Sequence, residues 1–274
     1  MPAFNKIFVV IDPTTDNQTA LSNAARIASH DNNIALHVYE GIYSDEKNMD
    51  PVALERVELE RHRAWVESLV APIRESGNPV EVEIEWTSQW RDAIAPAAEN
   101  SQADLIVKAA SVHSGAGRRL LKTSDWTLLR QAHCPVYLIK KDTVSPGARI
   151  LVALDIARQD EVHTELNDRV IEYGSLLAEL IPDSDLHAVN AYSDAENFIY
   201  QPDLAAKIGV ERTSAHAVEG DPENVIPEVA EEIQAEIVVI GTAARAGIKA
   251  AVIGNTAEKI LDALHTNIFT VKQS

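Results

Sequence analysis

Short apolar runs alternate with longer amphipathic stretches along the whole chain. The runs are rich in Val and Ile, which is typical of strands that are buried on both faces of a parallel sheet. The longer stretches between them repeat their apolar residues at the spacing of a helix. We predict strands at residues 6–12, 33–40, 80–86, 103–109 and 135–140, and again at 150–155, 185–191, 214–219, 235–240 and 267–272.

Helices are predicted between these strands. The helix that begins at Pro51 is the clearest, because proline is favoured at the first helical position. Its apolar residues Leu54, Val57, Trp65 and Leu69 recur at roughly helical spacing. The predicted helices span residues 16–30, 51–76, 90–101 and 123–132 in one half of the chain, and 160–180, 222–233 and 255–264 in the other.

The series of apolar runs occurs twice in the same order, which indicates a duplication. The matching segments are 7–12 with 150–155, 34–38 with 185–189, 103–107 with 235–239, and 134–140 with 266–272. We therefore predict two tandem α/β domains, residues 1–143 and 144–274, each a five-stranded parallel sheet with helices on both faces. Ser145-Pro146-Gly147 marks the boundary between them.

The second copy is shorter between its second and third strands. His37 and His187 are 150 positions apart, but Asp104 and Glu236 only 132, so the second copy lacks about 18 residues. The missing piece corresponds to most of the helix at 51–76. Because loss of a crossover helix would expose one face of a sheet, we favour a loop omitted from the sequence as given over a true loss of the helix.

Candidate chemistry lies where ligands of open parallel sheets bind, at the carboxyl ends of strands where the strand order reverses. In the second copy, the fourth strand runs into Gly241, and the next helix follows Gly254. Glycine lets backbone N–H groups approach an anion, and a helix N-terminus attracts one. We expect Asn255 or Thr256 to cap this helix, with Glu258 placed for a capping box.

This loop resembles that of the universal stress protein family, and the resemblance covers the whole chain twice. The family places Gly-x-x-Gly, nine residues and then Gly-Ser or Gly-Thr between the fourth strand and its helix. Here Gly241 and Gly254 match the first and third glycines, Ala244 replaces the second, and Asn255 replaces the Ser or Thr, with Thr256 next to it. The resemblance is closest to the tandem E type, through the segments 9–13, 125–130 and 254–258.

The resemblance implies a Rossmann-like fold of the adenine-nucleotide-alpha-hydrolase-like type, with ATP or another adenine nucleotide as ligand. In ATP-binding members this loop holds the phosphates and ribose, and an Asp after the first strand contacts the nucleotide. The site residues implied here are Asp155, Gly241, Ala244, Arg245, Gly254, Asn255 and Thr256. In the first copy, Ala109, Val112 and Lys122 stand at the three glycine positions, so we expect no phosphate binding there.

The expected function is that of a non-enzymatic regulatory or ligand-binding protein of the stress response. No zinc spacing, Walker loop or nucleophile elbow occurs, so we assign no catalytic and no metal-ligating residue. Two alternatives stay open. One is a weak ATP-binding protein or ATPase, which Asp155 and the partial loop favour. The other is an adaptor for an apolar or lipid-like ligand, which the alanine-rich segment 243–251 favours.

The amino-acid composition limits which partners and which cellular compartment we expect. A net charge of -18 disfavours nucleic acid. No apolar run approaches the roughly 20 residues of a membrane span. The single cysteine, Cys134, and the absence of a signal-peptide pattern favour the cytoplasm. The fifth strands are apolar sheet edges, and we expect the two halves to pack pseudo-symmetrically through them; a further homodimer is left open.

Overall fold

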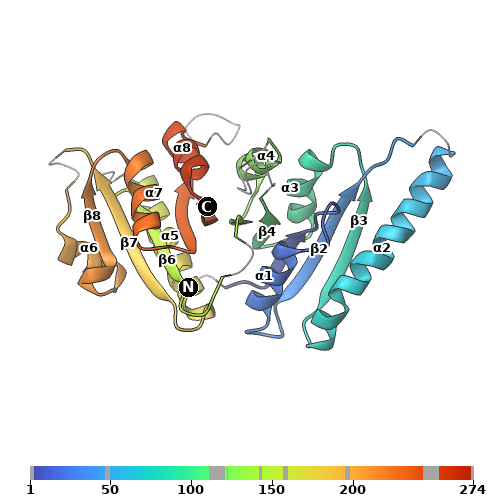
Figure 1. The fold of residues 1–274 in the computed structure, drawn as a ribbon, viewed down its shortest axis with the longest axis horizontal. Helices are drawn as coiled ribbons and strands as arrows, with labels where there is room; N and C mark the ends of the chain where they lie inside the picture. The colour runs from blue at the N-terminus through green and yellow to red at the C-terminus, as the bar shows by residue number, and fades with distance from the viewer. Residues whose placement is uncertain are drawn as a thin grey trace. The chain divides into compact units, whose positions relative to one another are not determined.

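The computed structural model describes residues 3–46, 50–110, 121, 123–141, 144–156, 160–194, 198–242 and 253–272. The chain falls into two compact units (Figure 1). The amino-terminal unit consists of Phe4–Ala109 and Thr123–Cys134, and the carboxyl-terminal unit is built mainly from Pro135 onward. The domain division between residues 143 and 144 stays a prediction.

The amino-terminal unit contains a sheet whose strand order is β3-β2-β1-β4. The bounds are β1 Lys6–Val10, β2 Ala35–Ile42, β3 Val80–Trp86 and β4 Leu105–Ala109. All three pairings are parallel, and β1 lies between β2 and β4. The chain order therefore reverses at β1, which places the ends of β1 and β4 at the position where such sheets bind ligands.

The helices that the structure describes in this unit are α1 Thr19–Ala28, α2 Pro51–Glu75, α3 Trp90–Asn100 and α4 Thr123–Gln131. The start of α2 is as predicted, with Pro51 in its first turn and the Asp50 carboxylate accepting a hydrogen bond from the Ala53 N–H at 3.0 Å. This helix packs along β3, whereas α3 packs against α4 (Figure 1).

The carboxyl-terminal unit has the strand order β5-β10-β9-β6-β7-β8. Its strands are β5 Val136–Ile139, β6 Arg149–Leu154, β7 Asp185–Tyr192, β8 Ala215–Glu219, β9 Ile237–Thr242 and β10 Asn267–Lys272. Neighbouring strands are parallel except for β5 and β10, which are antiparallel. The helices are α5 Glu161–Leu180, α6 Gln201–Ile208, α7 Pro222–Glu232 and α8 Asn255–Ala263. The predicted α/β fold class is confirmed.

The connection between β7 and β8 corrects one expectation. We favoured an omitted loop here, but the full sequence joins these strands through α6, a helix of 8 residues where α2 has 25. Helix α6 buries Leu204, Ala205 and Ile208 and ends at Gly209, whose φ of 79° suits the left-handed conformation. The short helix covers the edge only partly, because Ala215 is the single buried residue of β8.

The pairing of β5 with β10 has a local two-fold character. Tyr137 is paired with Phe269, its equivalent under the 132-residue offset of the repeat, and their ring centroids are 5.8 Å apart. The pairs on either side are Val136 with Thr270 and Leu138 with Ile268. These two pairs exchange places when each residue is replaced by its equivalent, so the strand pair is pseudo-symmetric about the two rings.

Candidate nucleotide site

The carboxyl ends of β6 and β9 meet where the strand order of the carboxyl-terminal unit reverses. Strand β6 lies between β9 and β7, and Ala153 is paired with Ile240. Asp155 follows β6 directly and therefore lies beside the last residues of β9. Two of the predicted site residues, Asp155 and Gly241, are thus on neighbouring strands at the crevice expected to bind ligands.

Two buried amides fix the backbone at Asp155. The Asp155 N–H donates to Asn167 Oδ1 at 3.0 Å, and Asn167 Nδ2 donates back to the Asp155 carbonyl at 2.8 Å. The next N–H, that of Ile156, donates to Asn190 Oδ1 at 3.1 Å. Asn167 and Asn190 are buried, whereas Asp155 is exposed. These hydrogen bonds fix the backbone that follows β6, and Asp155 itself is exposed.

Gly241 is explained by helix packing. A Cβ at this position would lie 2.6 Å from Cγ of Leu166, a residue that α5 buries. Only glycine therefore lets α5 approach β9 this closely. The phosphate role that the sequence assigned to Gly241 stays a prediction, and the packing accounts for this glycine without it.

Gly254 stands in open surroundings at the start of α8. It is the N-cap residue, with a φ of −64°, and no atom of the described residues lies within 4 Å of where its Cβ would be. No side chain of the described residues caps the helix there. Our expectation of a cap at Asn255 or Thr256 is wrong, because both lie inside the first turn and are exposed.

The entry to α8 consequently has the properties of an anion site. The first N–H groups of a helix have no partner within the helix, and they carry the positive end of the helix dipole. With glycine at the N-cap, no Cβ restricts the approach of a ligand to these groups. Ala244 and Arg245, the remaining predicted site residues, lie outside the described residues.

The amino-terminal unit is built differently at the equivalent place. Lys108, near the end of β4, donates from Nζ to Asp125 Oδ1 of α4 at 2.6 Å and to the Ala109 carbonyl at 3.0 Å. Lys108 and Asp125 are both buried, with exposed fractions of 6% and 0%. A buried ion pair therefore occupies the region between the fourth strand and the following helix.

The acid after the first strand also differs between the copies. Asp12 Oδ1 accepts hydrogen bonds from the Thr14 N–H at 2.9 Å and the Thr14 hydroxyl at 2.6 Å. Gln18 takes the part of Asn167, because its amide accepts from the Asp12 N–H and donates to the Asp12 carbonyl. The Asp12 carboxylate thus stabilises a local turn.

The sequence analysis did not identify Lys108 and Asp125, nor the side-chain amides of Gln18 and Asn167 that bind the backbone of Asp12 and Asp155. The first two carry a usable signal, because under the 132-residue offset they stand opposite Ile240 and Ala257. Where one copy of a repeat has charged residues and the other has apolar residues at the equivalent positions, the two copies differ in chemistry. The two amides carry no such signal, because Gln18 and Asn167 lie at different distances in sequence from Asp12 and Asp155.

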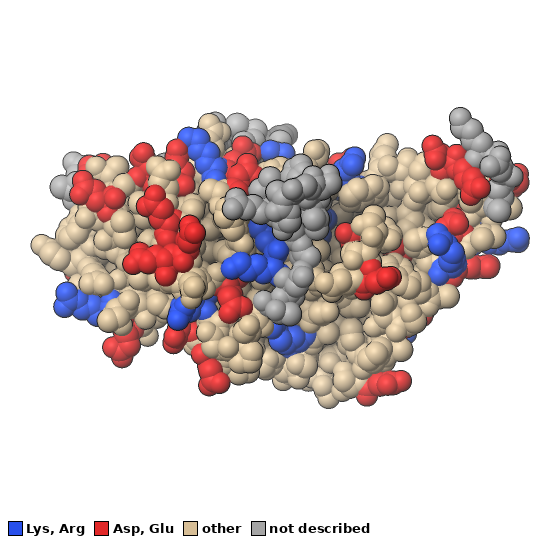
Figure 2. Space-filling model, in the orientation of Figure 1, with Lys and Arg blue, Asp and Glu red and all other residues tan. Residues whose placement is uncertain are grey.

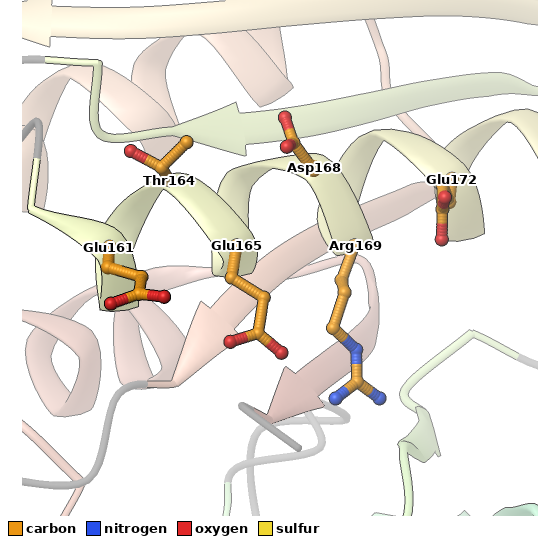
Figure 3. Close-up of a pocket in the computed structure, with 6 residues that line it drawn as sticks. All are labelled: Glu161, Thr164, Glu165, Asp168, Arg169 and Glu172. Carbon is orange, nitrogen blue, oxygen red and sulfur yellow. The ribbon is translucent and has the colours of Figure 1, made fainter.

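A surface groove of ≈ 560 Å³ lies along α5 (Figure 3) and is separate from the predicted site residues. It is lined by Glu161, Thr164, Glu165, Asp168, Arg169 and Glu172. Four of these six are acidic, and acidic side chains also gather on the face drawn in Figure 2. A groove of this charge repels phosphates, so it does not compete with the α8 entry as a nucleotide site.

The histidines of the second strands lie in contacts within the sheets. His37 is buried, and its Nε2 is 2.7 Å from Glu83 Oε2. His187 Nδ1 is 3.2 Å from His216 Nε2 on the neighbouring strand, with the rings 17° from parallel. In the described part of the chain, no group of three or more His, Cys, Asp or Glu residues is arranged to hold a metal ion.

Comparison with known proteins identifies relatives over the full length. The sequence model of the universal stress protein family matches residues 3–140 and 183–272. Universal stress protein E of Escherichia coli K12 is 29% identical over 99% of this chain and 95% of its own length. The homolog from Haemophilus influenzae is 30% identical, over 99% of this chain and 98% of its own.

A solved structure agrees with the fold. The crystal structure of a putative universal stress protein from Pseudomonas aeruginosa UCBPP-PA14 has a TM-score of 0.83 to this chain. It is 29% identical, and the match covers 98% of this chain and 94% of that one. None of the described helices of the present chain is long and apolar enough to cross a membrane.

Proposed function

The chain belongs to the universal stress protein family, and from this premise we propose that it is a non-enzymatic regulator of the stress response whose carboxyl-terminal half binds an adenine nucleotide. The observation that carries the proposal is the start of α8, where no described side chain caps the helix and no described atom lies close to the Cβ position of Gly254. Asp155 stands exposed at the strand-order reversal of the same unit.

Each group has a distinct part in the proposed site. The first N–H groups of α8 would bind phosphate oxygens, and glycine at the N-cap admits them. The Asp155 carboxylate, an acceptor, would bind a hydroxyl or amino group of the nucleoside. Arg245 would add the local positive charge that a chain with a net charge of -18 needs to hold a polyanion.

The proposal is tested by titrating ATP into the protein in a calorimeter and comparing Gly254→Glu with the wild type. A carboxylate at the N-cap interacts favourably with the helix dipole, so we expect the variant to fold. The same carboxylate repels phosphate from the first N–H groups of the helix. We expect ATP affinity to fall by at least roughly tenfold, the equivalent of about 1.4 kcal/mol.

Ala263→Glu is the matched control, because it adds the same charge at the other, exposed end of α8. Its ATP affinity should stay within about twofold of the wild type, since the added charge is further than a Debye length from the site. Equal losses in both variants would show a general charge effect and no phosphate site at Gly254. A folded wild type that binds no nucleotide contradicts the proposal outright.

The rate of ATP hydrolysis distinguishes a non-enzymatic regulator from the alternative, a weak ATPase. Hydrolysis needs a positioned water and usually a metal ion, and Asp155 is the one acid that the predicted site offers. We therefore expect ATP bound to the protein to release phosphate no faster than ATP in buffer. Release above that rate that disappears in Asp155→Asn would favour the ATPase.

Assembly and location are part of the same proposal. The pseudo-symmetric register of β5 and β10 supports packing of the two halves about a local two-fold axis through Tyr137 and Phe269. We propose a cytoplasmic protein, because a chain with a single cysteine cannot form an intrachain disulfide, which fits a reducing compartment. A homodimer remains a further proposal, which sedimentation of the purified chain would decide.

A further inference from the structure

The buried charge pair of the amino-terminal unit stands where the other unit has its open helix entry. Lys108 of β4 is paired in the sheet with Val10 of β1, at the reversal of strand order. Asp125 lies in the first turn of α4. Their ion pair, 2.6 Å long, therefore joins the sheet to the N-terminus of α4 at the place where a ligand of this fold would bind.

The fold does not require charges at these positions. Under the 132-residue offset, Lys108 corresponds to Ile240, and Asp125 corresponds to Ala257. Ile240 is buried where β9 meets β6, and Ala257 is half-buried in the first turn of α8. The second copy thus folds with apolar residues at both positions, and apolar residues in place of a buried ion pair are often at least as stable.

The chemistry of the pair matches that of a bound oxyanion. A carboxylate in the first turn of a helix interacts with the same positive dipole end that attracts phosphate. A lysine ammonium is a common partner of phosphate in proteins. Lys108 and α4 therefore provide the two usual elements of a phosphate site, and Asp125 supplies an anion to both from within the chain.

We propose that Asp125 acts as an internal ligand that closes the amino-terminal unit to phosphate-bearing molecules. Its carboxylate neutralises Lys108 and takes the position at α4 that an oxyanion would take. Removal of the carboxylate should open a site for inorganic phosphate. This inference does not depend on nucleotide binding by the carboxyl-terminal unit.

Two variants of the full chain test the inference by thermal unfolding in potassium phosphate and in potassium chloride of equal ionic strength. Asp125→Ala removes the internal anion and leaves Lys108 buried without it. Lys108→Ile combined with Asp125→Ala installs the pair that the second copy carries at Ile240 and Ala257. The two variants differ only in the cation at position 108.

We expect phosphate to raise the unfolding temperature of Asp125→Ala by on the order of 3 °C more than that of the wild type or the double variant, as for a ligand near ten times its dissociation constant. In chloride, the double variant should unfold at a higher temperature than Asp125→Ala. Phosphate binding at the α8 entry would shift all three proteins alike, so its presence or absence does not change the comparison.

Three results would overturn the inference. The first is an equal phosphate shift in all three proteins. The second is an Asp125→Ala protein that stays unfolded in phosphate although the double variant folds, since no oxyanion would then replace the carboxylate. The third is a double variant that does not fold, because the charge pair would then be a requirement of the fold.

Discussion

Gly241 and Gly254 belong to one predicted loop but stand in different surroundings. A Cβ at Gly241 would meet Leu166 at 2.6 Å, whereas a Cβ at Gly254 would meet no atom of the described part of the chain within 4 Å. The sequence pattern treats both as phosphate-loop glycines. At residue scale, the structure separates a glycine required by packing from a glycine that leaves a helix entry open.

We predict that Gly241→Ala destabilises the protein by about 1–3 kcal/mol, because the added methyl group must displace Leu166 or shift α5. Gly254→Ala should cost less than about 1 kcal/mol, the difference between alanine and glycine at an N-cap. Urea unfolding of both variants measures these losses. Leu166→Ala should relieve part of the Gly241→Ala loss in the double variant, and equal losses at the two glycines would contradict the packing role.

The apolar pattern predicted most of the elements because it follows from burial. Strands β3 and β10 have the predicted bounds, and α2 begins at the predicted Pro51. Among the connections between strands, the wrong expectation concerned the crossover that contains α6. A short helix is tolerated there because β8 is an edge strand that stays largely uncovered. The periodicity of apolar residues does not show how much of an edge strand must be covered.

The candidate site was harder to predict than the elements. The resemblance pointed to Asp155 and Gly254, which the structure places at a strand end and a helix start of one unit. The amide of Asn167 and the packing of Leu166 depend on contacts between α5 and strands distant in sequence. Such contacts leave no local pattern, so the sequence could not separate the packing glycine from the open one.

At the scale of elements, the neighbouring strands β7 and β8 carry a pH-sensitive contact. Burial, together with the neighbouring His216, lowers the pKa of His187, and burial lowers the pKa of His216. Asp185 opposes the shift at His187 and Arg149 reinforces it, while Glu232 opposes the shift at His216. Folding therefore favours the neutral form of both imidazoles.

Unfolding restores the ordinary histidine pKa of 6.5, so at and below that pH the unfolded chain binds more protons than the folded one. The free energy of unfolding should consequently fall as the pH drops from about 7 to about 5. Urea midpoints across this range should show a smaller fall in a His187→Gln, His216→Gln variant. The exposed His30, changed to Gln, is the control, and an unchanged fall in the double variant would contradict the assignment.

At the scale of the whole molecule, the duplication has produced two copies with different chemistry. In the carboxyl-terminal unit, no described side chain caps the N-terminus of α8, and the acid after β6, Asp155, is exposed. The amino-terminal unit has a buried Lys108–Asp125 pair at the equivalent place. The proposed nucleotide site of one unit and the proposed closure of the other together give one nucleotide site for each chain.

The number of adenine nucleotides bound per chain tests this account most directly. Equilibrium dialysis of the full-length protein against radiolabelled ATP, at concentrations well above the dissociation constant, gives that number. The account predicts one ATP for each chain. Two for each chain would contradict the closure of the amino-terminal unit, and none, with the protein folded, would contradict nucleotide binding by this protein.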